Sequence, residues 1–250
     1  MADEPAAALA AAFANDALIA ALPAAAVADA AAARRLQAQV VDRLGLALAG
    51  WKIGATSAKA QANMATDAPF YGPLFRERIW ADGAVVDLPA GFRGVECEFA
   101  LRIGAALPPR QGGYGVEQLV IAVDAVVPVL ELVATRQRVE GMADARRATA
   151  DLGFNHGLVL GPPLMPPPTR ELADAAVTLR VDGVAAAHGR GADVLGHPLA
   201  ALAWLTGQGI ALPAGALVST GTCTGLTPIA AGATAEGDFG PLGRVRVQAV

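Results

Sequence analysis

Residues 126–134 restrict the possible folds of this sequence more than any other segment. They read VVPVLELVA, and Glu131 is the only charged residue among them. Such a run predicts a strand that is buried on both faces inside a sheet. Because an unpaired buried carboxylate is costly, we expect Glu131 to be protonated, paired with a cation or bound to a metal ion. Pairing with an arginine such as Arg102 or Arg136 is the structural alternative to a metal.

A second strand is predicted where apolar and polar residues alternate. Residues 95–103 read VECEFALRI, which places Glu96, Glu98 and Arg102 on one face and the apolar side chains on the other. On a strand, Glu96 and Glu98 point to the same side, with Cα atoms roughly 6.5–7 Å apart. Taken alone, this pattern is typical of a half-exposed strand with a solvated polar face.

Glu131 changes the interpretation of this pair of glutamates. If Glu96, Glu98 and Glu131 converge, their charges repel one another unless a cation lies between them. Carboxylate oxygens suit Mg²⁺, Mn²⁺ or Ca²⁺, and three side chains leave open positions on an octahedral ion for water and substrate. The sequence therefore predicts an open divalent-metal site of the kind that Lewis-acid catalysis requires.

Composition excludes several other classes of protein. The chain has 250 residues, 54% of them hydrophobic, and a net charge of -4, which argues against a nucleic-acid partner. Cys97 and Cys223 are too few for a disulfide framework, so we expect a reducing, cytoplasmic location. The alanine-rich stretch 5–33 is interrupted by two aspartates and by Pro23. It fits neither a signal peptide nor a membrane span, and no membrane partner is expected.

The pattern of helix and strand signals predicts an α+β fold with a central mixed or antiparallel sheet. We expect an N-terminal helical region over residues 1–50 and a catalytic domain over residues 51–250, although one continuous domain also fits. Helices are predicted at 5–22, 24–45, 116–126, 142–152 and 197–207, with a short one capped by Thr56 or Ser57 and running to residue 64. Strands are predicted at 51–54, 85–88, 95–103, 127–135, 157–160, 217–223 and 243–250, with a hairpin at 176–187 around Asp182-Gly183.

Short motifs along most of the chain resemble, in order and spacing, those of the fumarylacetoacetate hydrolase superfamily. Glu96-Cys97-Glu98 followed by Glu131 is similar to the ExE…E metal triad of that superfamily. The branch it resembles contains the 2-keto-4-pentenoate hydratases, the 2-oxohept-3-enedioate hydratases and the 4-oxalocrotonate decarboxylases. Further matching segments are WKIGATS (51–57), YGPLF (71–75), GHPL (196–199) with AWL (203–205), GTCT (221–224) and FGPLG (239–243).

The resemblance implies a fold and an activity. The fold is the mixed, β-rich α+β fold of the superfamily with an N-terminal helical region, usually in a dimer or larger homo-oligomer. The activity is that of a hydro-lyase, dependent on Mg²⁺ or Mn²⁺, that adds water to a 2-hydroxy-2,4-dienoate in the meta-cleavage degradation of aromatic compounds. The small-molecule partner would be a 2-oxo or 2-hydroxydienoic acid.

The resemblance also assigns roles to residues. Lys52 is the expected active-site lysine, as a proton shuttle or as a cation near the substrate carboxylate, and its apolar neighbours argue against a fully exposed surface position. The metal ligands would be Glu96, Glu98 and Glu131, the catalytic residues Lys52, Glu96 and Glu131, and the substrate-binding residues Lys52, Asn155, His156, Thr222 and Thr224.

The sequence departs from the motifs of the branch near the expected substrate. Phe70 stands where the branch carries an aspartate before F-G-x-L-F, and Phe154, Asn155 and His156 replace small polar residues. These departures indicate a bulkier or more apolar substrate, or a different reaction on the same metal. Two alternatives therefore stay open, a 2-oxo-acid decarboxylase of the 4-oxalocrotonate type and a non-catalytic protein that binds a 2-oxo acid.

Overall fold

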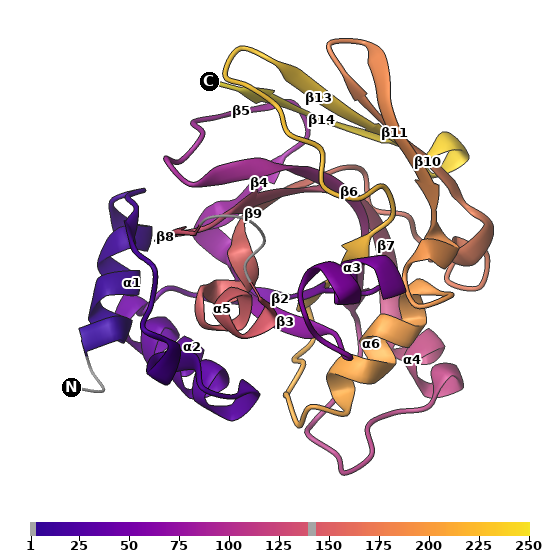
Figure 1. Cartoon of the computed structure of the whole chain (residues 1–250). Helices are drawn as coiled ribbons and strands as arrows, with labels where there is room; N and C mark the ends of the chain where they lie inside the picture. The colour runs from indigo at the N-terminus through magenta and orange to yellow at the C-terminus, as the bar shows by residue number, and fades with distance from the viewer. Residues whose placement is uncertain (1–3, 140–143) are drawn as a thin grey trace.

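Two β-sheets make up the body of the computed structural model, which describes residues 4–139 and 144–250 (Figure 1). Along the seven-stranded sheet the order is β3 (Phe70–Phe75), β2 (Leu48–Gly54), β12 (Leu217–Thr222), β6 (Phe92–Ile103), β7 (Val123–Ala134), β9 (Asn155–Leu160) and β4 (Ile79–Ala81). Along the five-stranded sheet it is β11 (Val184–Arg190), β10 (Ala176–Val181), β13 (Thr234–Asp238), β14 (Arg244–Ala249) and β5 (Ala84–Val86). A third, two-stranded sheet joins β1 (Ile19–Ala20) to β8 (Gln137–Arg138).

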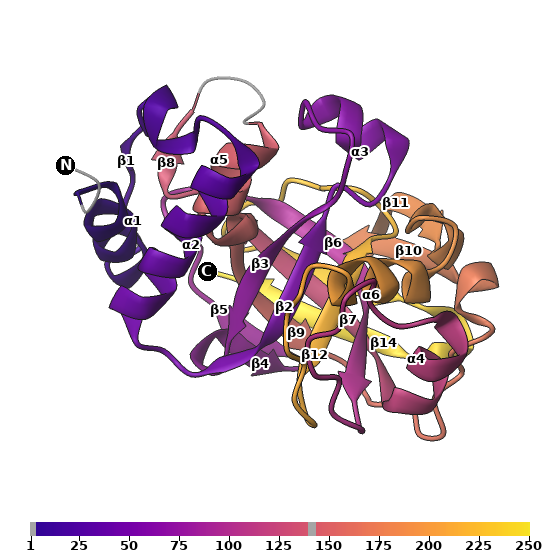
Figure 2. The same cartoon turned by 90° about the horizontal axis from the view of Figure 1, so that it is seen from below.

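The α-helices lie around the seven-stranded sheet (Figure 2). The α-helices are α1 (Glu4–Ala14), α2 (Ala30–Leu44), α3 (Ala58–Asn63), α4 (Val116–Ala122), α5 (Ala145–Ala150) and α6 (Pro198–Thr206). The 3₁₀ turns are η1 (Ala24–Val27), η2 (Arg76–Arg78), η3 (Leu152–Phe154), η4 (Leu172–Asp174), η5 (Gly191–Asp193) and η6 (Gly240–Leu242). The α+β fold class predicted from the sequence is confirmed.

The strands β6 and β7 form the centre of the larger sheet. They pair antiparallel from Phe92 opposite Ala134 to Ile103 opposite Val123. The apolar face of β6 packs toward the five-stranded sheet, where the Phe99 ring meets the Phe239 ring edge-on at 5.2 Å between centroids. Burial of both faces of β7 confirms the expectation for the apolar run around Glu131.

The N-terminal helices pack on one another and on the edge of the larger sheet. Their shared core brings Leu9 and Phe13 of α1 against Phe75 of β3 and Leu152 of η3. Since this core takes residues from both sides of residue 50, the helices are continuous with the sheet, and the proposed division at residue 50 stays a prediction.

The predicted ends of the first two helices are wrong. The first helix stops at Ala14, and the chain turns through Asp16, which has a φ of +46°, into β1. The second helix begins only after Asp29, whose carboxylate accepts a hydrogen bond from the Ala32 N–H at 2.7 Å. A turn thus ends the first helix and a cap residue starts the second, although alanine has a high helix propensity throughout this region.

Most of the other elements match the prediction in type. The hairpin at Asp182-Gly183 is confirmed, with positive φ at both residues, and Ser57 caps α3 as expected. The predicted helix at 116–126 ends at Ala122, because its last residues belong to β7. Helix α5 lies within the predicted 142–152, of which residues 142–143 fall outside the described part. Sequence reasoning missed the strands β3, β4 and β13.

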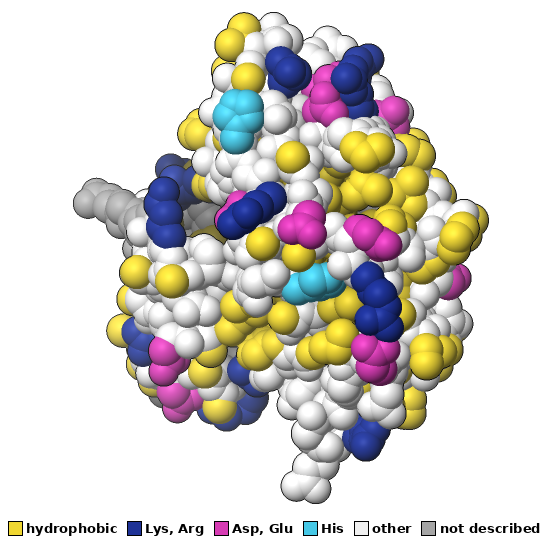
Figure 3. All heavy atoms as spheres, turned by 90° about the vertical axis from the view of Figure 1, so that its right-hand side faces the viewer, with side chains coloured by type: hydrophobic (Ala, Val, Ile, Leu, Met, Phe, Trp, Pro, Cys, Tyr) yellow, Lys and Arg dark blue, Asp and Glu magenta, His cyan; other side chains and the backbone are white. Residues whose placement is uncertain are grey.

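Two surface properties bear on the expected partners. On the face shown in Figure 3, Lys and Arg side chains lie among Asp and Glu side chains rather than in one continuous basic patch. Within residues 4–139 and 144–250, no helix has the length and apolarity needed to cross a membrane.

Candidate metal centre

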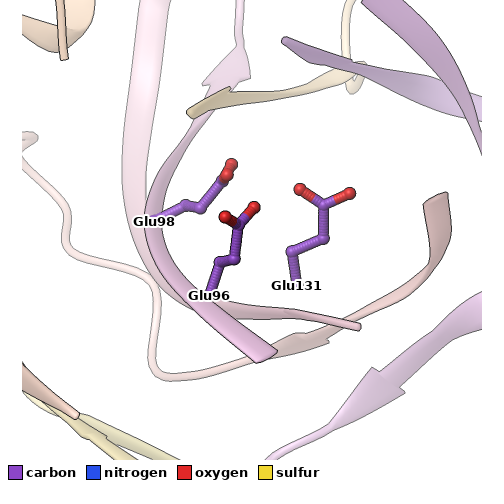
Figure 4. A group of neighbouring side chains, drawn as sticks. All are labelled: Glu96, Glu98 and Glu131. Atoms are coloured by element: carbon purple, nitrogen blue, oxygen red, sulfur yellow. The ribbon is translucent and has the colours of Figure 1, made fainter. Parts of the chain in front are cut away.

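The three glutamates picked out from the sequence come together in the structure. Glu96 lies directly opposite Glu131 across the pairing of β6 with β7, and Glu98 follows two residues along β6. One carboxylate oxygen from each lies within 4.8 Å of the others, and the three side chains point toward one another (Figure 4). Glu98 is 1% exposed and Glu131 is fully buried. The alternative of a solvated polar face on β6 is therefore wrong at Glu98, whereas Glu96 stays partly exposed.

Glu98 is held by the end of β12. Its Oε2 accepts hydrogen bonds from the Ser219 hydroxyl at 2.5 Å and from the Gly221 N–H at 3.0 Å. Gly221 has a φ of +109°, and a Cβ there would come within 2.1 Å of the Thr56 hydroxyl oxygen. A side chain at position 221 would collide with Thr56, so only glycine can present its N–H to the Glu98 carboxylate here. Ser219 was not singled out from the sequence, although it is the first polar residue of an apolar strand.

Lys52 and Asn155 hold Glu131 on one side. Its Oε1 lies 3.1 Å from the Lys52 Nζ and accepts a hydrogen bond from the Asn155 side chain at 2.9 Å. The Lys52 Nζ also donates to the carbonyl oxygen of Gly153 at 3.1 Å, and this lysine is only 3% exposed, as expected. The other oxygen of Glu131, Oε2, is buried and has no hydrogen-bond partner. A buried acceptor of this kind calls for a donor or a cation.

The alternative in which an arginine neutralises Glu131 is wrong. Arg102 pairs with Asp124 at 2.7 Å, and Arg136 pairs with Asp151 at 2.5 Å. Lys52 of β2 is the cation that pairs with Glu131. This partner lies in a strand far away in sequence, so neighbouring positions could not reveal it.

The electrostatics of the cluster favour a divalent cation. Three carboxylates and one ammonium group give a formal charge of -2 when all are ionised. Burial, followed by the charge of Glu131, raises the pKa of Glu96 to about 7, and burial raises the pKa of Glu98 well above its ordinary value. Burial alone would lower the pKa of Lys52, but the charges of Glu131, Glu98 and Glu96 outweigh it and raise that pKa. The three carboxylates fit an oxygen-liganded ion such as Mg²⁺ or Mn²⁺, which would relieve their repulsion.

Thr222 ends β12, opposite Glu98 of β6, and Thr224 lies in the turn that follows. The Thr224 hydroxyl accepts a hydrogen bond from the Cys97 N–H at 3.2 Å, and the Thr222 hydroxyl accepts one from the Gly225 N–H at 2.8 Å. Both hydroxyls therefore stabilise the turn next to Glu98. Their substrate-binding role stays a prediction.

His156 does not join the cluster, although it follows Asn155 directly. Successive residues of a strand point to opposite faces. The His156 ring stacks on Trp80 at 5.7 Å between centroids, and its Nε2 lies 3.5 Å from an Arg78 nitrogen. Burial, followed by the charges of Arg78 and Arg136, lowers the pKa of His156 to about 3.

This environment of His156 predicts how stability depends on pH. Between its folded pKa of about 3 and its ordinary value of 6.5, the unfolded chain binds the additional proton, so stability is lost as the pH falls through this window. The loss from this group should reach about 1–2 kcal/mol between pH 7 and pH 5. Urea unfolding of the His156→Gln variant should show a shallower pH dependence than the parent. The matched His188→Gln variant, on the exposed strand β11, should keep the parent's slope; equal slopes for all three proteins would contradict the assignment.

A second buried network, which the sequence did not reveal, positions the segment between Asp151 and Asn155. Asp151 is fully buried and accepts hydrogen bonds from the Arg136 N–H at 2.8 Å and from the Thr135 hydroxyl at 2.9 Å. The Arg136 guanidinium donates to the backbone carbonyls of Asp151 at 2.6 Å and Asn155 at 2.7 Å. It thus holds both ends of the segment whose Gly153 carbonyl binds Lys52.

Comparison with known proteins agrees with this geometry. The family model for the C-terminal domain of fumarylacetoacetate (FAA) hydrolase matches residues 47–250. The chain is 30% identical to the 2-oxo-hept-4-ene-1,7-dioate hydratase of Escherichia coli over 230 residues, which cover 87% of this chain and 84% of that enzyme. It is also 30% identical to the 2-keto-4-pentenoate hydratase of Paraburkholderia xenovorans (strain LB400), over 88% of this chain and 82% of that enzyme.

Solved structures show the same fold. The 4-oxalocrotonate decarboxylase from Pseudomonas putida G7, complexed with magnesium and adipate, superimposes with a TM-score of 0.89 at 25% identity and covers 100% of this chain and 97% of its own. The match of the family model over most of the chain, including all three clustered glutamates, leads to one conclusion. The chain belongs to the fumarylacetoacetate hydrolase family.

Proposed function

We propose that this protein is a divalent-metal-dependent hydratase that adds water to a 2-hydroxy-2,4-dienoate of the 2-keto-4-pentenoate type, in the meta-cleavage degradation of aromatic compounds. The observation that carries the proposal is the triad of Glu96, Glu98 and Glu131, of which the last two are buried, with Lys52 beside it and one carboxylate oxygen left without a partner. Relatives at about 30% identity that bear the names of such hydratases support the choice of reaction.

The triad would hold Mg²⁺ or Mn²⁺, and the similar decarboxylase complexed with magnesium supports this choice. A bound divalent ion supplies Lewis-acid polarisation of the oxygens of a 2-oxo acid and stabilises the negative charge of its enolate. Ser219 and Gly221 fix the carboxylate of Glu98, and Asn155 fixes that of Glu131. These residues set the orientation of the ligand oxygens before the substrate arrives.

Lys52 has two roles that its position allows. Its ammonium group lies between Glu131 and the Gly153 carbonyl, so it offers a buried positive charge beside the site. We propose that this charge attracts the substrate carboxylate, and that Lys52 moves a proton to or from the carbon skeleton as the dienol becomes the 2-oxo tautomer. The hydroxyls of Thr222 and Thr224 complete the proposed substrate-binding set.

The proposal is tested by following a dienoate directly. With Mg²⁺ present, the protein should bleach the ultraviolet absorbance of 2-hydroxypenta-2,4-dienoate as water adds to the double bond. Chelation of the metal should stop this reaction. If no member of a panel of 2-hydroxy-2,4-dienoates loses absorbance, the hydratase proposal is wrong.

A second candidate, decarboxylation of a 2-oxo acid of the 4-oxalocrotonate type, is favoured by Phe70. Addition of water requires a group that activates the water. The Phe70 ring lies beside Lys52, with its centre 5.5 Å from the ammonium nitrogen, and an aromatic ring cannot take a proton from water. The carboxylates whose charges act on Lys52 are the three glutamates proposed as metal ligands. Asp67 lines a separate hollow between α3 and α5. Release of carbon dioxide from 4-oxalocrotonate would separate this reaction from hydration.

A non-catalytic role is the third outcome of these assays. Thermal stabilisation by pyruvate or oxalate with Mg²⁺, without turnover of any dienoate or 2-oxo acid, would favour a protein that only binds a 2-oxo acid.

We also propose that the protein is cytoplasmic and forms a dimer or larger homo-oligomer. The two cysteines, both free and buried, are consistent with a reducing compartment. Light scattering on the purified protein measures the assembly directly, and a monomer at micromolar concentration would exclude the proposed oligomer.

A further inference from the structure

An apolar cluster lies beside the Lys52 side of the metal centre. We call it the apolar wall, and it is defined by Phe70 and Phe154 together with Ala55, Ala60, Met64, Ala145 and Ala148. Phe70 is nearly buried, whereas Phe154 and Met64 stay partly exposed. The wall draws residues from α3, β3, α5 and η3, and Ala55 and Met64 flank α3 on either side.

The apolar wall adjoins the metal centre at Lys52. The Phe70 ring faces the Lys52 ammonium at 5.5 Å. Phe154 follows Gly153, whose carbonyl binds Lys52, and precedes Asn155, which binds Glu131. Phe154 has a φ of +57°, which L side chains rarely adopt, and its N–H donates to the Asp151 carbonyl at 2.8 Å. Strain of this kind is retained where the surrounding structure fixes a side chain in place.

The charges beyond the wall do not suit a second carboxylate. Next to Ala145 lies an open hollow of about 500 Å³, and Arg146 is the one cation among the described residues that line it. The Arg146 guanidinium is already engaged, with Asp144 at 3.3 Å and the Ala28 carbonyl at 2.9 Å. Asp67 lines the same hollow and would repel an anion.

We propose that the apolar wall receives the part of the substrate distal to its 2-oxo acid, and that this tail is an uncharged alkyl or aryl group rather than a second carboxylate. The inference rests on the proposed function, because it assumes that the metal centre holds the 2-oxo acid. Relatives of both kinds exist by name, since one is a hydratase of a dioate and others are hydratases of 2-keto-4-pentenoate. The apolar wall therefore favours a monoacid substrate of the proposed hydratase over a dioate such as 4-oxalocrotonate, the substrate of the second candidate function.

Binding of stable 2-oxo acids tests the inference without turnover. Calorimetry with Mg²⁺ would compare pyruvate, 2-oxobutanoate, 2-oxopentanoate and 2-oxohexanoate with the dioates 2-oxoglutarate and 2-oxoadipate. Each added methylene should tighten binding by about threefold, as expected for an apolar subsite. A dioate should bind at least about tenfold more weakly than the monoacid of the same carbon number, because Arg146, the one cation among the described residues that line the hollow, is already engaged by Asp144 and the Ala28 carbonyl.

The outcomes separate the two proposals. If pyruvate binds but the dioates bind as tightly as the monoacids or more tightly, the apolar wall is wrong and the metal centre stands. If no 2-oxo acid binds in the presence of Mg²⁺, the proposed function fails first and the inference with it.

A charge placed on the wall provides a second, independent test. Phe154→Arg should shift the ratio of dioate to monoacid affinity by about tenfold toward the dioate. The matched control is Ile121→Arg, which adds the same charge at an 82% exposed position of α4, on the opposite side of the molecule from α5 (Figure 2). If Phe154→Arg folds and the ratio of dioate to monoacid affinity stays unchanged, the inference is overturned. If this variant does not fold, the affinities of the parent protein for the 2-oxo acid series decide the question.

Discussion

Replacing Glu131 by glutamine should abolish both metal-dependent stabilisation and activity. The parent protein should melt roughly 5–10 °C higher when Mg²⁺ is present at about 100 times its dissociation constant. In Glu131→Gln this rise should disappear, because the variant loses one ligand charge and leaves Lys52 without its ion pair. Turnover should fall by on the order of a thousandfold, as expected when several kcal/mol of charge stabilisation in the transition state are lost.

The measurement compares each protein with and without metal, so any change in basal stability cancels. The matched control is Glu117→Gln, which removes the same charge from an exposed carboxylate paired with Arg170 at 2.5 Å. That control should keep both the metal-dependent rise and the activity. If Glu131→Gln binds Mg²⁺ like the parent, the three glutamates are not the metal site.

The central strands and the metal cluster could be predicted because their patterns are local. Strict alternation placed Glu96 and Glu98 on one face, and a single charge in an apolar run marked Glu131 as unusual. What these patterns could not give is the register of β6 against β7, which sets Glu96 opposite Glu131. The resemblance to a family supplied this step, since it implied that the three side chains share one ion.

The remaining contacts of the site depend on pairings that are distant in sequence. Ser219 reaches Glu98 across 121 positions, and Lys52 binds the carbonyl of Gly153 across 101 positions. No local pattern encodes such contacts. The end of the first helix was mispredicted for a related reason, because the short strand β1 forms only by pairing with β8.

His156 illustrates a different limit of sequence reasoning. The resemblance gave it the same substrate-binding role as Asn155, yet alternation along β9 turns the two side chains to opposite faces. The same rule that located Glu96 and Glu98 could have separated this pair. The prediction began the strand only at residue 157, so it treated residues 155 and 156 as a loop.

Breaking the buried pair of Arg136 and Asp151 should cause a large loss of stability. Both side chains are almost completely buried and meet at 2.5 Å. Asp151→Asn leaves the Arg136 guanidinium charged and unpaired, which should cost about 3–5 kcal/mol of unfolding free energy and lower the Tm by roughly 10 °C. Denaturant unfolding measures this loss. The exposed pair of Arg170 and Glu117 is the control, and Arg170→Ala should leave the unfolding midpoint close to that of the parent.

A double variant separates the stabilising role of this pair from its positioning role. Arg136→Met with Asp151→Leu removes both charges, so it should lose less stability than the sum of the two single changes. Its activity should nevertheless stay low, because the guanidinium no longer holds the carbonyls of Asp151 and Asn155. The Gly153 carbonyl and the Asn155 amide, which fix Lys52 and Glu131, then lose their support. If the double variant has both the stability and the turnover of the parent, Arg136 contributes to stability alone. The metal centre would then keep its geometry without Arg136.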